Sequence, residues 1–123
     1  MTDTQTTSRP RETTLPDLVE QIVEAARDKK AEKLVILDLR PAKAFTDYFV
    51  ICSGRSGTQV KSITEHIEAR LKQIGHRPAH IEGIGTNWVL IDCFDCIIHV
   101  FTPAARDFYA LERLWGSAEP VEI

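Results

Sequence analysis

The sequence predicts a single α/β domain in which a mixed β-sheet is flanked by helices, and three observations support this. A chain of 123 residues is long enough to bury one core and too short for two ordinary domains. Its apolar residues follow two periods, about 3.6 in some segments and about 2 in others. These segments follow one another in the order αββαβββα, so the apolar helix faces must be buried against a sheet.

The first half of the chain contains one expected helix and two expected strands. In residues 13–30, leucine, valine and isoleucine recur at helical spacing, Pro16 is tolerated in the first turn, and lysines stand at the end. Residues 33–39 and 46–54 are rich in β-branched and aromatic side chains, which favours strands. The proline-containing connection 40–45 separates the two strands.

The second expected helix, residues 56–75, has an apolar face and marked ends. Ser56 and Gln59 have the spacing of a capping box, and Gly75 is placed to end the helix. The last two expected strands are close enough to form a hairpin around Phe94 and Asp95. The remaining expected elements are strands in residues 78–84, 87–93 and 96–101 and a final helix in residues 103–115.

The two chain ends differ in composition from the domain between them. Residues 1–13 are rich in threonine, serine and arginine, which predicts a disordered lead before a domain of residues 14–118 and a tail of residues 119–123. The N-terminus lacks the apolar segment of a secretory signal peptide, and no apolar run approaches the ~20 residues that a membrane helix needs. We therefore expect a cytoplasmic protein with reduced thiols.

The charge balance and the aromatic residues suggest a protein partner. A net charge of −3 gives no general attraction to nucleic acid, and it suits a partner with a basic patch better. Tyr109 and Glu112 lie on a different helical face from the apolar residues around them, and aromatic side chains are enriched at protein interfaces. These features indicate an interaction surface near the C-terminus, whereas core packing is the ordinary role of any single aromatic residue.

Cys93, Cys96 and His99 have the spacing that metal ligands often show. A structural zinc site needs four ligands, and Cys96 and His99 are an odd number of residues apart, so they point to opposite faces of a regular strand. A redox pair of cysteines normally sits at a helix N-terminus, whereas this pair spans a predicted turn between strands. The pattern favours cysteines that act as small apolar residues within the strands. We therefore expect neither a metal nor a cofactor.

A glycine-containing loop, residues 52–59, lies between an expected strand and an expected helix, where backbone N–H groups can bind phosphate. The loop lacks the known phosphate-binding patterns, and turn and cap chemistry explains its glycines. Asp92 and Asp95 flank a turn, where aspartate is common for local reasons, and no Asp-x-Asp pair marks a catalytic metal site. The sequence therefore assigns no catalytic residue. The alternative to a protein without enzymatic activity is a nucleotide-binding enzyme that uses the loop Gly54–Gly57.

Three motifs closely resemble the ribosomal silencing factor family, also called Iojap-like. They are W-x-x-x-D from Trp88 to Asp92, H-V-F from His99 to Phe101, and R-x-F-Y-x-L-E-x-L-W from Arg106 to Trp115. The resemblance extends over about residues 16 to 116. It implies a nucleotidyltransferase-like fold without the catalytic carboxylates, and hence a protein that is not an enzyme.

The resemblance also implies a function and a partner. Members of this family bind the large ribosomal subunit through its ribosomal protein fourteen, block joining with the small subunit and repress translation when nutrients are limiting. It further suggests a homodimer in the free state. The residues expected to contact the ribosomal protein fall in the family motifs, and several are polar or amphipathic: Trp88, Asp92, Arg106, Tyr109 and Glu112.

One position departs from the family pattern. The family usually has glycine where this chain has Phe94, within what would be D-x-G-D, and such a glycine often marks a hairpin residue with positive φ. Phenylalanine in an unchanged backbone costs on the order of 1 kcal/mol. The alternative is a rebuilt hairpin.

Overall fold

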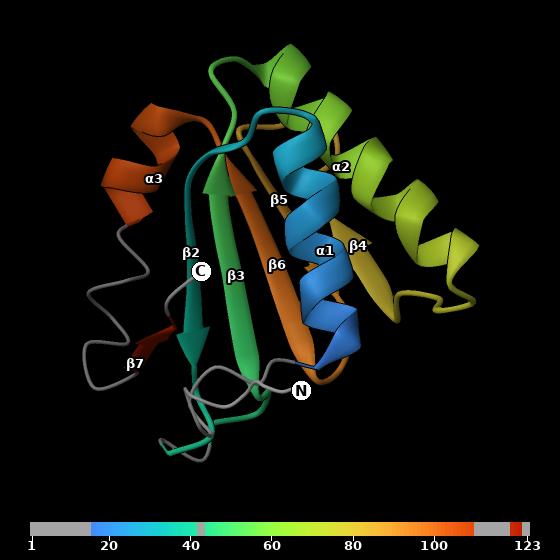
Figure 1. The fold of residues 1–123 in the computed structure, drawn as a ribbon. Helices are drawn as coiled ribbons and strands as arrows, with labels where there is room; N and C mark the ends of the chain where they lie inside the picture. The colour runs from blue at the N-terminus through green and yellow to red at the C-terminus, as the bar shows by residue number, and fades with distance from the viewer. Residues whose placement is uncertain (1–15, 42–43, 110–118, 122–123) are drawn as a thin grey trace, which may run out of the picture.

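The computed structural model describes residues 16–41, 44–109 and 119–121. The predicted order αββαβββα is confirmed, and a short final strand is added (Figure 1). The elements are α1 (Asp17–Asp28), β2 (Glu32–Asp38), β3 (Tyr48–Ser53), α2 (Gly57–Gln73), β4 (His80–Glu82), β5 (Trp88–Asp92), β6 (Cys96–Phe101), α3 (Pro103–Tyr109) and β7 (Glu119–Val121).

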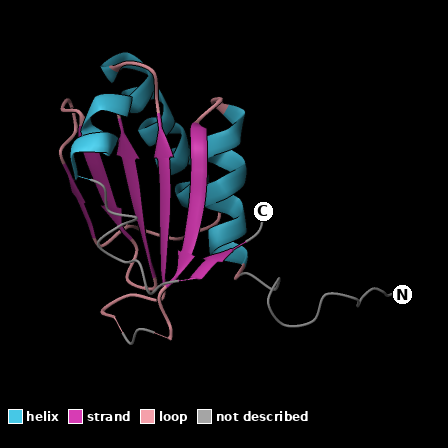
Figure 2. Ribbon diagram, turned by 90° about the vertical axis from the view of Figure 1, so that its left-hand side faces the viewer, coloured by secondary structure: helices cyan, strands magenta, loops and turns pink. Residues whose placement is uncertain are grey.

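A six-stranded mixed sheet forms the centre of the molecule, with the strand order β4-β5-β6-β3-β2-β7. β3 and β6 are parallel neighbours, while the other pairs are antiparallel. Every residue of β3 and β6 is buried, because central strands are covered on both faces. α1 and α2 pack on one face, and α3 lies against the other near the ends of β3 and β6 (Figures 1 and 2).

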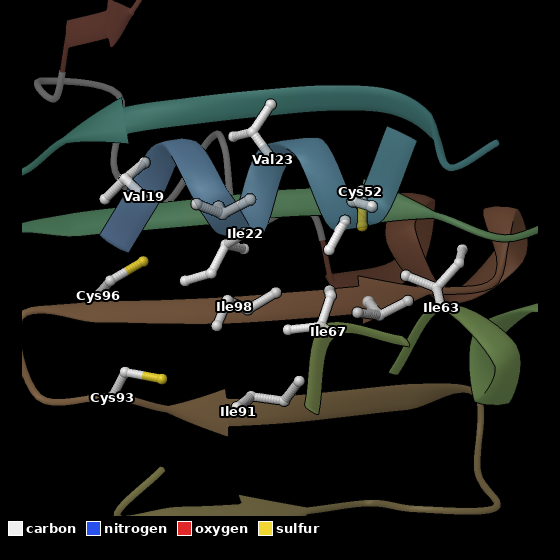
Figure 3. Close-up of a cluster of buried hydrophobic side chains, with 14 of the residues drawn as sticks. Val19, Ile22, Val23, Cys52, Ile63, Ile67, Ile91, Cys93, Cys96 and Ile98 are labelled. Carbon is white, nitrogen blue, oxygen red and sulfur yellow. The ribbon is translucent and has the colours of Figure 1, made fainter. Parts of the chain in front are cut away.

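The main core lies between α1, α2 and the sheet (Figure 3). The helical spacing of apolar residues in α1 and α2 brings their side chains to one side of each helix, and alternation along the strands supplies the opposing layer. Figure 3 shows this layer formed by side chains of all the central elements, including Val19, Ile22, Ile63, Ile67, Ile91 and Ile98.

The opposite sheet face carries a second apolar cluster, which includes Ala105 of α3. Its strand members occupy the alternate positions of β2, β3 and β6, since successive side chains of a strand point to opposite faces. Buried residues of this cluster are Leu37, Leu39, Phe49, Ile51, Ile97, Phe101 and Ala105.

The predicted ends of α2 are confirmed. Ser56 is the N-cap, and its Oγ accepts a hydrogen bond from the backbone N–H of Gln59 at 3.2 Å. Gly75 adopts φ +74, and the backbone N–H groups of Gly75 and His76 donate to the carbonyls of Lys72 and Leu71. This left-handed glycine satisfies the last carbonyls of the helix.

Other predicted elements differ in extent. The strand expected in residues 78–84 is limited to His80–Glu82, and the expected C-terminal tail contains β7, which pairs with β2. Pro120 lies opposite Leu37 in that pair, and a proline is tolerated because β7 is an edge strand. The lead of residues 1–13 and the final part of the helix expected in residues 103–115 lie outside the described residues.

The predicted hairpin between β5 and β6 is confirmed, and Phe94 is the residue at its turn with a left-handed backbone, φ +67. The backbone N–H of Asp95 donates to the carbonyl of Cys93 at 2.8 Å, and the N–H of Phe94 donates to Asp92 Oδ1 at 2.8 Å. These bonds maintain a conformation that costs a bulky residue on the order of 1–2 kcal/mol. The backbone is thus the one that glycine would favour, and phenylalanine occupies it under strain.

Replacing this residue by glycine should stabilise the protein. We expect Phe94→Gly to raise the free energy of unfolding by about 0.5–1 kcal/mol, because relief of strain exceeds the extra entropy of the unfolded chain. The control is Ile84→Gly, at an exposed loop position whose φ is not positive, where the same kind of change should be destabilising. Urea denaturation measures both, and an equal loss of stability in the two variants would contradict the strain at residue 94.

Candidate protein-binding face

The outer part of the second sheet face, over β4 and β5, is only partly covered. Cross-strand pairing places His80 opposite Asp92 and Glu82 opposite Leu90, so these side chains share a face with Trp88 by alternation. The residues between them, Val89 and Ile91, point instead into the core under α1 and α2. We call the following residues the β4–β5 face: His80, Glu82, Trp88, Leu90 and Asp92.

Trp88 is the largest side chain of the β4–β5 face, and it is half-buried. Its indole stacks on Phe101 with 5.1 Å between ring centroids, and its Nε1–H donates to His99 Nδ1 at 3.1 Å. The turn before β5 requires Gly83, because a Cβ at that position would lie 2.1 Å from the carbonyl oxygen of Trp88. Thr86 Oγ1 closes the same turn by donating to the carbonyl of Gly83 at 2.6 Å.

His99 lies behind Trp88 and is almost fully buried. Because Nδ1 accepts from Trp88, the neutral ring carries its proton on Nε2, and that buried atom has no hydrogen-bond partner. The ring of Phe49 packs edge-on against the imidazole, with 4.6 Å between centroids. Burial lowers the pKa of His99 from its ordinary value of 6.5 to about 4, so the ring is uncharged at neutral pH.

Carboxylates border the apolar part of this face. Asp92 is half-buried at the end of β5, and its Oδ1 accepts from the backbone of Phe94. Glu82 is exposed on β4 and lies 2.7 Å from the ring of His80, measured from Oε2 to Nε2. Trp88 and Leu90 therefore form an apolar strip with acidic groups beside it.

Of the five residues predicted to contact a partner, the structure places Trp88 and Asp92 on this face. Arg106 lies on α3 and is buried, with its Nη1 donating to the carbonyl of Lys33 at 2.6 Å and to Ser53 Oγ at 3.0 Å. It therefore holds α3 against the start of β2 and the end of β3. Tyr109 is the last residue of α3, with a side chain outside the described part of the structure, and Glu112 lies outside the described residues.

The motifs did not indicate Glu82 or Leu90, which the register between β4 and β5 brings beside Asp92 and Trp88. The two-residue period of a strand in residues 87–93 could have shown that the side chain of Leu90 lies on the same face as those of Trp88 and Asp92. No local signal places Glu82 there, because the pairing of β4 with β5 depends on the turn between them.

The cysteines and His99 point to opposite faces of the sheet, as strand alternation predicts. Cys93 and Cys96 lie in the core under α1 and α2 (Figure 3), whereas His99 lies against Phe49 and Trp88 on the other face. Burial raises the pKa of Cys93 to about 11, and it also raises the pKa of Cys96. These thiols are core residues, and among the described side chains no group of three metal-binding residues comes together.

The glycine loop before α2 is closed by its own side chains. The backbone N–H of Arg55 donates to Gln59 Oε1 at 2.6 Å, and the N–H of Gln59 donates to Ser56 Oγ. Gly54 is needed for packing, because a Cβ there would lie 2.9 Å from the backbone nitrogen of Val60. The backbone N–H groups of Arg55 and Gln59 are therefore already bonded within the loop.

A groove of about 950 Å³ runs between the second half of α2 and β4. Charged side chains of both signs line it, among them Glu65, Glu68, Lys72 and Arg77. Trp88 and Asp92 do not line this groove, although His80, the cross-strand partner of Asp92, lies at its edge. We therefore regard the β4–β5 face as the better candidate for a functional surface.

The fold and this face define the chain as a protein-binding α/β domain. One sheet face has a partly open apolar strip beside carboxylates, and such a surface is suited to contact with another protein. None of the described helices is long and apolar enough to cross a membrane. A family model described as "Ribosomal silencing factor during starvation" matches residues 12–123. The chain belongs to this ribosomal silencing factor family.

Individual relatives agree with this assignment. The chain is 38% identical over 108 residues to a ribosomal silencing factor of Halalkalibacterium halodurans, covering 87% of this chain and 92% of that protein. It is 29% identical to the mouse mitochondrial assembly of ribosomal large subunit protein 1, covering 79% of this chain and 44% of that protein. A crystal structure of a Chromobacterium violaceum protein superimposes with a TM-score of 0.78 at 32% identity, covering 81% and 84% of the two chains.

The buried histidine should make stability depend on pH. Because its pKa is lower in the folded state than in the unfolded state, stability is fully present above about pH 6.5 and is lost as the pH falls towards 4. We expect wild-type protein to lose roughly 2–3 kcal/mol more than His99→Asn between about pH 7 and pH 4.5. Asparagine can still accept from Trp88, and equal losses in urea denaturation would show that His99 does not titrate in this way.

Proposed function

We propose that this protein binds the large ribosomal subunit through large-subunit ribosomal protein fourteen and thereby blocks joining with the small subunit. In this way it represses translation under nutrient limitation. It acts in the cytoplasm as a regulator with no enzymatic step, and it is a homodimer when free. The observation that carries the proposal is the β4–β5 face, in a chain that belongs to the ribosomal silencing factor family.

The chemistry of the face supports a protein partner with basic side chains. Tryptophan is common among residues that dominate binding energy, and Trp88 is held in a fixed orientation by Phe101 and His99. Asp92 and Glu82 beside it favour cationic groups on the partner. Proteins that are themselves bound to ribosomal RNA carry such groups, whereas the RNA phosphates would be repelled by these carboxylates.

The proposed contact residues comprise two groups. Trp88 and Asp92 contact the partner from the β4–β5 face, and Tyr109 and Glu112 contact it from the end of α3 and the segment that follows. Arg106 contributes indirectly, because its bonds to Lys33 and Ser53 hold α3 in position.

Co-sedimentation with purified large ribosomal subunits tests the proposal. We expect binding at micromolar protein and moderate salt, and reduced formation of complete ribosomes when small subunits are added. Absence of binding under these conditions would contradict the proposed function.

Reversing a charge on the β4–β5 face should weaken this binding. Glu82 is exposed and contacts the exposed ring of His80, so Glu82→Lys should leave the fold intact and place a cation against a basic partner. We expect the dissociation constant to rise about 5- to 30-fold, which corresponds to roughly 1–2 kcal/mol. The matched control is Glu65→Lys, an exposed position on α2, which should bind like wild type; equal effects of the two changes would indicate general electrostatics instead of a specific face.

Replacing Tyr109 and Glu112, the two proposed contact residues at the end of α3 and in the segment after it, should weaken large-subunit binding to a similar extent. The double change Tyr109→Ala and Glu112→Ala should weaken large-subunit binding by roughly 1–3 kcal/mol if both are interface anchors. Circular dichroism and the melting temperature should stay near the wild-type values. Unchanged binding, or binding lost only together with the fold, would show that these two residues are not contacts.

A further inference from the structure

Two exposed phenylalanines occur in neighbouring loops at one end of the sheet. Phe94, in the turn between β5 and β6, is 70% exposed, and Phe45, in the connection between β2 and β3, is 73% exposed. Both loops lie at the same end of the sheet in Figure 1. We call Phe45, Phe94, Asp47 and Asp95 the phenylalanine tip.

Hydrogen bonds join the two loops of the phenylalanine tip. Thr46 Oγ1 donates to the carbonyl of Phe94 at 2.7 Å. The backbone N–H groups of Asp47 and Tyr48 both donate to the carbonyl of Asp95 at 3.1 Å. The backbone at the tip is therefore held in one arrangement, which lowers the entropy that binding to a partner would cost.

Folding does not account for phenylalanine at position 94. The residue has φ +67, where glycine would be relaxed, and its side chain is mostly in water, so it contributes little apolar burial. The chain thus retains a strained backbone and an exposed aromatic ring together. Strain that brings no packing gain in the isolated protein points to a function for that side chain.

Two exposed carboxylates flank the phenylalanines of the tip. Asp47 and Asp95 are exposed, and no described side chain forms an ion pair with either of them. Arg40, at the same end of β2, is paired with Asp38 through Nη2 and Oδ2 at 2.8 Å, and it also interacts electrostatically with Asp47. The two exposed rings therefore stand beside carboxylates that are available to a cationic partner.

We infer that the phenylalanine tip is a docking point for a protein surface that carries arginine or lysine beside apolar groups. Cationic side chains can stack on the exposed rings and pair with Asp47 and Asp95. RNA would bring phosphates against these carboxylates, and a two-fold pair of this chain would bring the carboxylates against themselves. A basic protein surface is the occupant that the charges favour.

The inference rests on the proposed function and adds a second contact to it. Asp92 belongs to the β4–β5 face and also accepts from the backbone of Phe94, so the face and the tip are continuous. A basic protein of the large subunit that covers Trp88 and Asp92 can therefore reach Phe94 without leaving the same surface.

Phe94→Gly is the first test, because it removes the ring while favouring the existing backbone. We expect its dissociation constant for purified large subunits to be about 5- to 30-fold above the wild-type value, as for loss of one interface anchor. The control Ile84→Gly removes an exposed apolar side chain from the turn between β4 and β5 and should change binding less than twofold. Wild-type affinity for Phe94→Gly would overturn the tip as a contact and leave the proposed function standing, whereas failure of the wild type to bind would overturn both.

Photo-crosslinking identifies the occupant. With p-benzoylphenylalanine in place of Phe94, irradiation of the complex with large subunits should join position 94 to a basic ribosomal protein. A crosslink to ribosomal RNA or to a second copy of this chain would overturn the assignment of a basic protein partner. A protein that binds with wild-type affinity and yields no crosslink from position 94 would contradict the docking point itself.

Discussion

The parallel pairing of β3 with β6 determines the arrangement of the remaining elements. Two parallel neighbours need a crossover connection, and here α2, β4 and β5 supply it. The crossover takes α2 over one face of the sheet and returns through β5, which then lies antiparallel to β6. Both central strands are buried along their whole length. Their pairing therefore requires the nearly continuous apolar runs that the sequence has in β3 and β6.

The same pairing gives the two ends of the sheet different roles. At the ends of β3 and β6, Arg106 fastens α3, and the side chains of the loop before α2 bind its own backbone. At the starts of these strands, two loops meet and expose Phe45 and Phe94. In many α/β proteins the ligand lies at the carboxyl ends of the strands; here Arg106 and the side chains of the loop before α2 make structural bonds at that end.

Local patterns predicted much of the fold. The apolar period, Ser56 and Gly75 were sufficient for α2, and alternation predicted that Cys96 and His99 would point to opposite faces. β7 was not predicted, because its pairing with β2 joins residues far apart in sequence and Pro120 argues against a strand. For the candidate site, motifs indicated Trp88 and Asp92, but only the pairing of β4 with β5 brings Glu82 to them, and only the packing shows that Arg106 is buried.

The two edges of the sheet limit how the protein can associate with itself. β4 and β7 are each three residues long; β4 exposes the ionisable side chains of His80 and Glu82, and β7 contains Pro120, which has no backbone N–H to offer. Short, charged or proline-containing edges discourage the strand-to-strand pairing that leads to open-ended assemblies. The sheet can therefore leave an apolar strip partly uncovered without its edges acting as templates for aggregation.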